Sequence, residues 1–113
     1  MDLRARHDIV GSLPVVALEG SVDMSTLPQL GDALLRLVSD HHGRQVAVDL
    51  DGVDVLDDTG LGVLLGAAGR ARQAGGDVVI VVADERLRAR FAATGFDRAV
   101  QVVDRLSAVA PPT

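Results

Sequence analysis

The chain has 113 residues, a formal net charge of −5, no cysteine and only two aromatic residues. A single-stranded nucleic acid needs aromatic platforms for its bases and basic surface for its phosphates, so this composition argues against direct nucleic-acid binding. The lack of cysteine excludes disulfides and thiol chemistry, and the lack of a signal peptide or of an apolar run of roughly 20 residues predicts a cytoplasmic protein without membrane contact.

The first part of the chain predicts a β-hairpin. Residues 3–10 mix apolar and polar side chains as an edge strand does, and residues 15–18 form a short apolar strand. Between them, Gly-Ser-Leu-Pro at 11–14 has the composition of a turn. A second glycine-containing stretch, residues 20–23, is expected to end the second strand.

A helix is expected next. It begins near Ser25 or Thr26, with Pro28 in the first turn, where a missing backbone N–H costs nothing. The sequence His-His-Gly at 41–43 ends it. Its apolar residues recur at helical spacing and are Leu27, Leu30, Leu34, Leu37 and Val38.

Strands and helices alternate after this point. Residues 45–50 predict a strand, and residues 59–74 predict a helix that stops at a Gly-Gly pair. Residues 77–83 contain a β-branched run, which is typical of a strand buried on both faces. Residues 85–93 predict the next helix.

The C-terminal part is expected to contain a short strand at 99–103, a final helix capped by Asp104 and reaching residue 110, and a tail at 111–113. Strands separated by helices predict a mainly parallel sheet. We therefore expect one α/β domain, residues 1–113, in which an opening β-hairpin precedes a mixed, mainly parallel sheet of about five strands with about four helices.

A strand–loop–helix corner at Asp57, Asp58 and Thr59 places two carboxylates and a hydroxyl at a helix N-terminus. Such oxygens accept the free N–H groups of the first turn, and the helix dipole favours negative charge there. The corner is thus a good N-cap, and it is also a candidate functional site.

The helix after this corner is more apolar than one buried face requires. A surplus of this kind fits either a helix buried by the next element or an exposed protein interface. The predicted core stripe is Leu61, Leu64, Leu65 and Ala68. The apolar residues that lean another way are Val63, Ala67, Ala71 and Ala74.

A dinucleotide-binding loop is a weak interpretation of the glycines at this corner. Gly60 and Gly62 follow two carboxylates, which would repel a pyrophosphate. Gly62, Gly66 and Gly69 share one helix face, and close packing of the helix on the sheet explains them better. No cofactor is expected.

Catalytic interpretations are also weak. Asp49 and Asp51 are similar to the first motif of the haloacid-dehalogenase-type phosphohydrolases, where two aspartates act with magnesium. The chain, however, has no lysine, and Asp104 stands alone where that family has an acidic metal motif. The serines lack the context of a hydrolase nucleophile, so neither catalytic residues nor metal ligands are expected.

Five short motifs in order resemble the STAS domain of the bacterial anti-sigma factor antagonists over nearly the full length. They are LEGSVD at 18–23, VDLDGV at 48–53, DDTGLG at 57–62, AGGDV at 74–78 and FAATGF at 91–96.

The resemblance implies regulation of transcription by partner switching, as in stress responses. Such proteins bind an anti-sigma factor, usually one with a serine-kinase fold, and so free a sigma factor. The kinase inactivates them by phosphorylating the residue after the aspartate that matches Asp57. That position is Asp58 here, so three interpretations stay open. Asp58 is a fixed partial phosphate mimic, Thr59 is the acceptor instead, or phosphoregulation has been lost.

The resemblance also implies a partner-binding surface around the N-terminus of the helix that follows the corner and the loop after the second strand. A STAS subunit of a lipid-transport or stress-signalling complex is the alternative function, and a small magnesium-dependent phosphohydrolase is a further one. The chain is expected to be a monomer or a weak dimer. A basic patch of arginines at 86, 88, 90 and 98 is better explained as a solvated helix face.

The expected partner-binding residues are Asp23, Met24, Ser25, Asp57, Asp58, Thr59, Gly60, Leu61 and Gly62.

Overall fold

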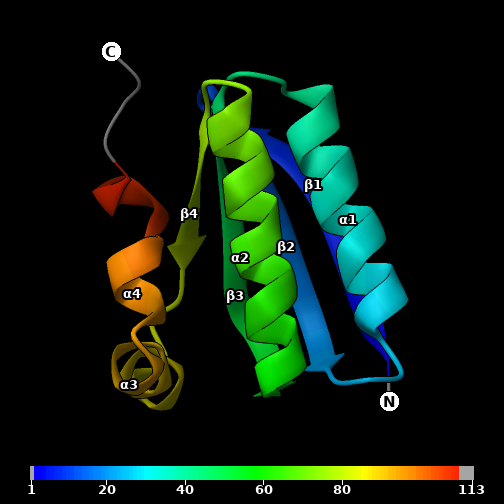
Figure 1. Cartoon of the computed structure of the whole chain (residues 1–113), viewed down its shortest axis with the longest axis vertical. Helices are drawn as coiled ribbons and strands as arrows, with labels where there is room; N and C mark the ends of the chain where they lie inside the picture. Colours follow the sequence, from blue (N-terminus) through cyan, green and yellow to red (C-terminus); the bar gives the residue numbers. More distant parts are fainter. Residues whose placement is uncertain (1, 110–113) are drawn as a thin grey trace.

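The computed structural model describes residues 2–109, which form a single five-stranded sheet with helices (Figure 1). The strands lie in the order of the sequence. The first pair is antiparallel and the other three pairs are parallel, as the sequence predicts. The strands are β1 (Leu3–Val10), β2 (Leu13–Val22), β3 (Gln45–Leu56), β4 (Asp77–Val81) and β5 (Gln101–Val103).

The helices pack on one face of the sheet. Because every parallel crossover moves to the next strand in the same direction, right-handed connections place all the crossover helices on the same side. Figure 1 shows α1 and α2 side by side over the strands, with α3 and α4 beyond β4. The helices are α1 (Leu27–Asp40), α2 (Asp58–Gln73), α3 (Glu85–Thr94) and α4 (Phe96–Ala99), and a 3-10 turn, η1, spans Leu106–Ala108.

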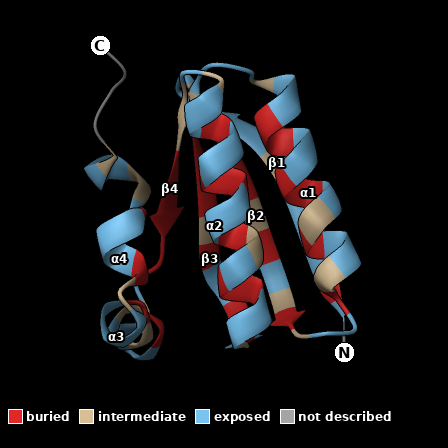
Figure 2. Ribbon diagram, viewed as in Figure 1, coloured by how far each residue is buried: buried red, intermediate tan, exposed pale blue. Residues whose placement is uncertain are grey.

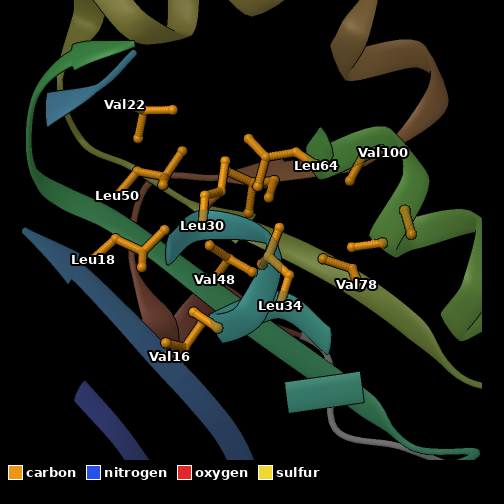
Figure 3. Close-up of a cluster of buried hydrophobic side chains, with 14 of the residues drawn as sticks. Val16, Leu18, Val22, Leu30, Leu34, Val48, Leu50, Leu64, Val78 and Val100 are labelled. Atoms are coloured by element: carbon orange, nitrogen blue, oxygen red, sulfur yellow. The ribbon is translucent and has the colours of Figure 1, made fainter. Parts of the chain in front are cut away.

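The main core lies between the sheet and these helices. The faces of α1 and α2 that point to the sheet are buried, and their outer faces are exposed (Figure 2). Aliphatic side chains fill most of the interior. The two aromatic residues, Phe91 and Phe96, stack on each other at the α3–α4 end of the core. Figure 3 shows the centre of this core, with Val16, Leu18, Leu30, Leu34, Val48 and Leu64.

The second face of the sheet carries a smaller apolar cluster of Val15, Ala47 and Val81, packed against Leu106 and Val109 at the C-terminal end. β4 is therefore covered on both sides, which confirms the prediction from its β-branched run. None of the helices in residues 2–109 is long and apolar enough to cross a membrane.

Two strands are longer than the sequence predicts. Residues 20–23 do not end β2 early, because the strand continues to Val22. The strand expected at residues 45–50 is also longer, because β3 continues to Leu56. Pairing shifts from Ala17↔Asp49 to Glu19↔Gly52, so β3 gains one residue in a bulge. The residue that permits this is Gly52, where a Cβ atom would lie 2.9 Å from the carbonyl oxygen of Leu18.

The C-terminal prediction needs correction. The short helix α4 precedes β5, which is only three residues long, and the sequence did not predict it. Instead of a final helix capped by Asp104, the chain forms η1, whose N-cap residue Arg105 makes no side-chain cap bond. The predicted end of that helix at residue 110 and the tail at 111–113 lie outside the described residues.

The buried face of α2 also differs from the expected stripe. Leu61, Leu64 and Ala68 are buried as predicted, but Leu65 is 40% exposed. The smaller alanines take its place against the sheet, since Ala67 and Ala71 are both buried. Small side chains allow α2 to approach the strands closely, and they leave part of its aliphatic surface facing outward.

Candidate functional site

The N-terminus of α2 lies beside the loop that follows β2. In the parallel pair of β2 and β3, Val22 is opposite Leu56, so the two strands end at the same edge of the sheet. The backbone N–H of Asp57 donates to the carbonyl oxygen of Val22 at 3.0 Å. Residues 23–26 and 57–59 therefore meet at one end of the molecule, the lower end in Figure 1.

Asp57 is the N-cap of α2. Its backbone is extended, with φ −88° and ψ 171°, and its Oδ1 accepts the N–H of Thr59 at 3.1 Å. The Thr59 hydroxyl donates to the same oxygen. The capping role that the sequence predicted is thus confirmed, and Asp57 also fixes the orientation of the Thr59 hydroxyl.

Asp58 occupies the first turn of α2 and points outward, with 87% of its side chain exposed. One guanidinium nitrogen of Arg90, on α3, lies 2.5 Å from its Oδ1. The Arg90 side chain is only 30% exposed, so it is not the solvated residue that the sequence suggested. No spacing rule could have found this pair, because its members are 32 positions apart.

Asp23 organises the loop between β2 and α1. Its Oδ1 accepts the Ser25 hydroxyl at 2.6 Å, the Ser25 N–H at 2.9 Å and the Thr26 N–H at 3.2 Å. The hydrogen bond from the Ser25 hydroxyl is the main cause that lowers the pKa of Asp23. Thr26 is the N-cap residue of α1 but makes no side-chain cap bond to the helix. Its hydroxyl donates instead to the Ser21 carbonyl oxygen, at 2.7 Å.

The tip of the same loop is apolar. Met24 is 75% exposed, the most exposed of the large hydrophobic residues in the described chain, and Ser25 beside it is also exposed. Exposed apolar side chains next to polar groups are typical of a protein interface.

The three other expected contact residues lie in different environments. Gly60 and Leu61 are buried, and Leu61 is only 6% exposed. A Cβ atom on Gly62 would meet nothing within 4 Å, so its outer side is open. Of these three positions, only Gly62 is exposed enough to touch a partner directly. Gly60 and Leu61 can act only by setting the position of α2.

The other glycines of α2 also face outward. A Cβ atom on Gly69 would meet nothing within 4 Å, and one on Gly66 would meet only the end of the Arg70 side chain. The prediction that these residues pack against the sheet is wrong. A shallow groove of about 640 Å³ runs between α1 and α2 from Thr59. It is lined by Gly31, Asp32, Leu35, Thr59, Gly62, Val63, Gly66 and Arg70.

The aspartates of the alternative phosphohydrolase site have structural partners. Asp49 accepts the N–H of Asp51 at 2.9 Å, and Asp51 accepts the N–H of Ala83 at 2.7 Å. They lie within the long strand β3. Within residues 2–109, no group of three or more His, Cys, Asp or Glu side chains is arranged to hold a metal ion.

Comparison with known proteins places this geometry in a family. The family model described as "Mlab, STAS domain" matches residues 5–104. The anti-sigma-B factor antagonists of Listeria monocytogenes and Listeria innocua are each 30% identical over 87 residues, covering 77% of this chain and 75% of theirs.

Solved structures share the fold. An anti-sigma factor antagonist from Mycobacterium paratuberculosis superposes with a TM-score of 0.83 at 24% identity, over 94% of this chain and 89% of that one. The phosphorylated form of the Bacillus cell fate determinant SpoIIAA gives a TM-score of 0.66 at 14% identity, over 93% and 96%. The chain belongs to the STAS domain family.

Proposed function

We propose that this protein is an anti-sigma factor antagonist, which binds an anti-sigma factor in the cytoplasm and so releases a sigma factor. The observation that carries the proposal is the exposed Met24 on the loop after β2, whose last residue, Val22, accepts the N–H of Asp57 at the start of α2. The names of the Listeria relatives support it. The protein acts by binding, not by catalysis.

The proposed contact surface, here named the corner surface, combines the β2–α1 loop with the first turn of α2. Its apolar anchor is Met24, and its polar rim includes Ser25, Asp58 and Thr59, all exposed. A central apolar anchor with a polar rim is the usual anatomy of a protein interface. Asp23 and Asp57 shape this surface through hydrogen bonds to its backbone.

Three versions of this function differ in how phosphorylation controls the corner surface. In the first, Asp58 imitates a phosphorylated residue with one charge in place of about −1.5 to −2, and binding is weak. In the second, the exposed hydroxyl of Thr59 is the acceptor. In the third, phosphoregulation has been lost altogether and the protein binds a different regulator constitutively. The ion pair argues against the first version, because Arg90 neutralises the carboxylate of Asp58.

The test is calorimetric binding of the wild type and of Asp58→Ser to each kinase-type anti-sigma factor from the same genome, with ADP present. Micromolar or tighter binding by the wild type is the expected result. Binding by Asp58→Ser alone would mean that Asp58 is a permanent off state. If neither protein binds any candidate, the antagonist function is wrong and a STAS subunit of another complex becomes the better hypothesis.

Phosphorylation of Thr59 has its own test. The protein is incubated with the kinase-type partner and ATP, and its intact mass is measured. An added phosphate that disappears in Thr59→Ala would support the second version, and an unchanged mass would exclude it and leave the first and the third. Thr94→Ala is a suitable control, because Thr94 is also an exposed helical threonine.

The enzyme alternative is tested by turnover of a generic phosphate ester in the presence of magnesium. We expect none, because the carboxylates of Asp49 and Asp51 already bind backbone N–H groups of the fold. Turnover that vanished in Asp49→Asn would contradict the proposal.

A further inference from the structure

We propose that Arg90 sets the charge of the corner surface, and that its ion pair with Asp58 keeps this surface able to bind its partner. The inference rests on the proposed function and concerns the control of the same site. It gives α3, which the sequence did not connect with the corner, a direct role in recognition.

The position of Arg90 is fixed by the packing of α3. The helix is capped by Asp84, which accepts the N–H of Arg86 at 2.8 Å, and is anchored by the buried side chains of Leu87 and Phe91. Arg90 precedes Phe91 and follows Leu87 by three positions, so it borders the buried face of the helix. Its side chain is 30% exposed, whereas that of Asp58 is 87% exposed. The arginine is thus the more constrained member of the pair.

The pair changes what a partner meets at the start of α2. A partner that covers a lone carboxylate must remove its water, which is costly unless a compensating charge is supplied. Arg90 supplies that charge from within the protein. At position 58 the partner then covers an ion pair in place of a lone carboxylate.

The size of the negative charge distinguishes Asp58 from a phosphorylated residue. A phosphate carries about −1.5 to −2 charges, which one arginine cannot neutralise. A carboxylate carries one negative charge, which one arginine can neutralise. With Arg90 present, Asp58 therefore corresponds to the unmodified, binding-competent state of the corner. Without Arg90, it would correspond more closely to the modified state.

Arg86 provides a matched control. It lies one turn before Arg90 on α3, has an 88% exposed side chain and pairs with Asp84 at 3.5 Å, not with Asp58. Arg86→Gln removes the same charge from the same helix and leaves the Asp58 pair in place. Any effect of Arg90→Gln that Arg86→Gln lacks is therefore not a general effect of removing a positive charge from α3.

The first measurement needs no partner. Urea unfolding of the wild type, Asp58→Asn, Arg90→Gln and the double variant gives the coupling between the two side chains. We expect the double variant to differ from the sum of the single variants by about two- to fivefold in the unfolding equilibrium constant, as for an exposed ion pair. Additive effects would overturn the inference and leave the proposed function standing.

The second measurement is calorimetric affinity of the same four proteins and Arg86→Gln for the kinase-type anti-sigma factor that binds the wild type. Arg90→Gln should weaken binding by on the order of tenfold or more, because it leaves the Asp58 carboxylate to be covered alone. In the Asp58→Asn background the same change should have little effect. Arg86→Gln should bind like the wild type.

Each result has a distinct meaning. If Arg90→Gln lowers the affinity equally in the wild-type and in the Asp58→Asn background, the partner contacts Arg90 directly and the inference is overturned. Tighter binding by Arg90→Gln would also overturn it, because the partner would then bind the unpaired carboxylate of Asp58. Urea unfolding could show that Asp58 and Arg90 stabilise each other while the wild type binds none of the candidate anti-sigma factors. In that case the proposed function fails, and the role of the pair in binding fails with it.

Discussion

Gly60 lies so close to Val22 that a Cβ atom built on the glycine would approach Val22 Cγ1 to 2.6 Å and Leu56 Cδ1 to 2.9 Å. Both aliphatic side chains belong to the main core. The first turn of α2 thus rests directly on the ends of β2 and β3, and the corner surface is positioned by this contact.

The Gly60–Val22 contact predicts opposite effects for two neighbouring glycines. Gly60→Ala should lower the free energy of unfolding by about 1–3 kcal/mol, because the new methyl group overpacks the core. Gly62→Ala should raise it by about 0.4–1 kcal/mol, because its position is open and alanine favours the helix. Urea denaturation of both variants checks this. Equal stability of the two would contradict the close approach of α2 to β2.

The cap at Asp57 gives a second prediction. Asp57→Ala should cost about 0.5–2 kcal/mol of unfolding free energy, because the Thr59 N–H loses its acceptor. Asp57→Asn keeps an acceptor oxygen and should cost less. Asp58→Ala removes only an exposed carboxylate and its ion pair, so its cost should stay below about 1 kcal/mol. Thermal and urea unfolding of the three variants would show this order, and a larger loss from Asp58→Ala would contradict it.

The exposed Met24 predicts a change in binding without a change in stability. Met24→Ser should weaken binding of the anti-sigma factor by on the order of tenfold, if this side chain is an anchor of the interface. Its unfolding free energy should stay within about 0.5 kcal/mol of the wild type, because the side chain is 75% exposed.

Ile9→Ser is the control for this experiment. Ile9 is 49% exposed and pairs with Pro14 near the opening turn, at the opposite end of β2 from the corner surface. It should bind the partner as the wild type does. Equal affinities of Met24→Ser and Ile9→Ser would remove Met24 from the interface.

The lowered pKa of Asp23 predicts an acid-dependent loss of stability. Hydrogen bonds, above all from the Ser25 hydroxyl, favour the charged carboxylate in the folded protein, so its pKa lies below the ordinary value of an aspartate. The stabilisation is fully present above the unfolded pKa and disappears as pH falls through the folded pKa. Ser25→Ala should lower stability near pH 7, and its deficit should shrink as pH falls from about 5 to about 2.

This pH dependence is checked by urea midpoints at each pH for the wild type, Ser25→Ala and Asp23→Asn. Asp23→Asn cannot ionise and should show a flatter profile than the wild type over the same range. Parallel profiles of all three proteins would show that the carboxylate of Asp23 is not tied to the loop.

Local interactions made several elements predictable. The cap of α2 depends on residues two positions apart, Asp57 and Thr59, so the sequence alone identifies it. The helical spacing of Leu30, Leu34 and Leu37 identifies the buried face of α1 for the same reason. A β-branched run identified β4, because burial on both faces leaves its sequence apolar throughout.

Strand lengths and the outer face of α2 were harder to predict. Asp51 and Gly52 have the composition of a turn, but a bulge against β2 keeps them in β3, and this depends on a neighbour more than 30 residues away. Leu65 has a core side chain on an outward position, and Ala67 and Ala71 occupy the buried face of α2 instead. The family motifs located the corner, but they could not assign its neighbours on other elements.

The sequence by itself determined the order of strands and helices, the hairpin before a parallel sheet, and the acidic corner at Asp57 and Asp58. These features depend on periodicity and on bonds between near neighbours. Only the tertiary structure brought Arg90 to Asp58 and left Met24 exposed on the loop after β2. The physical reason is that the direction of each crossover and the packing of α3 decide which side chains meet, and neither is written in local spacing.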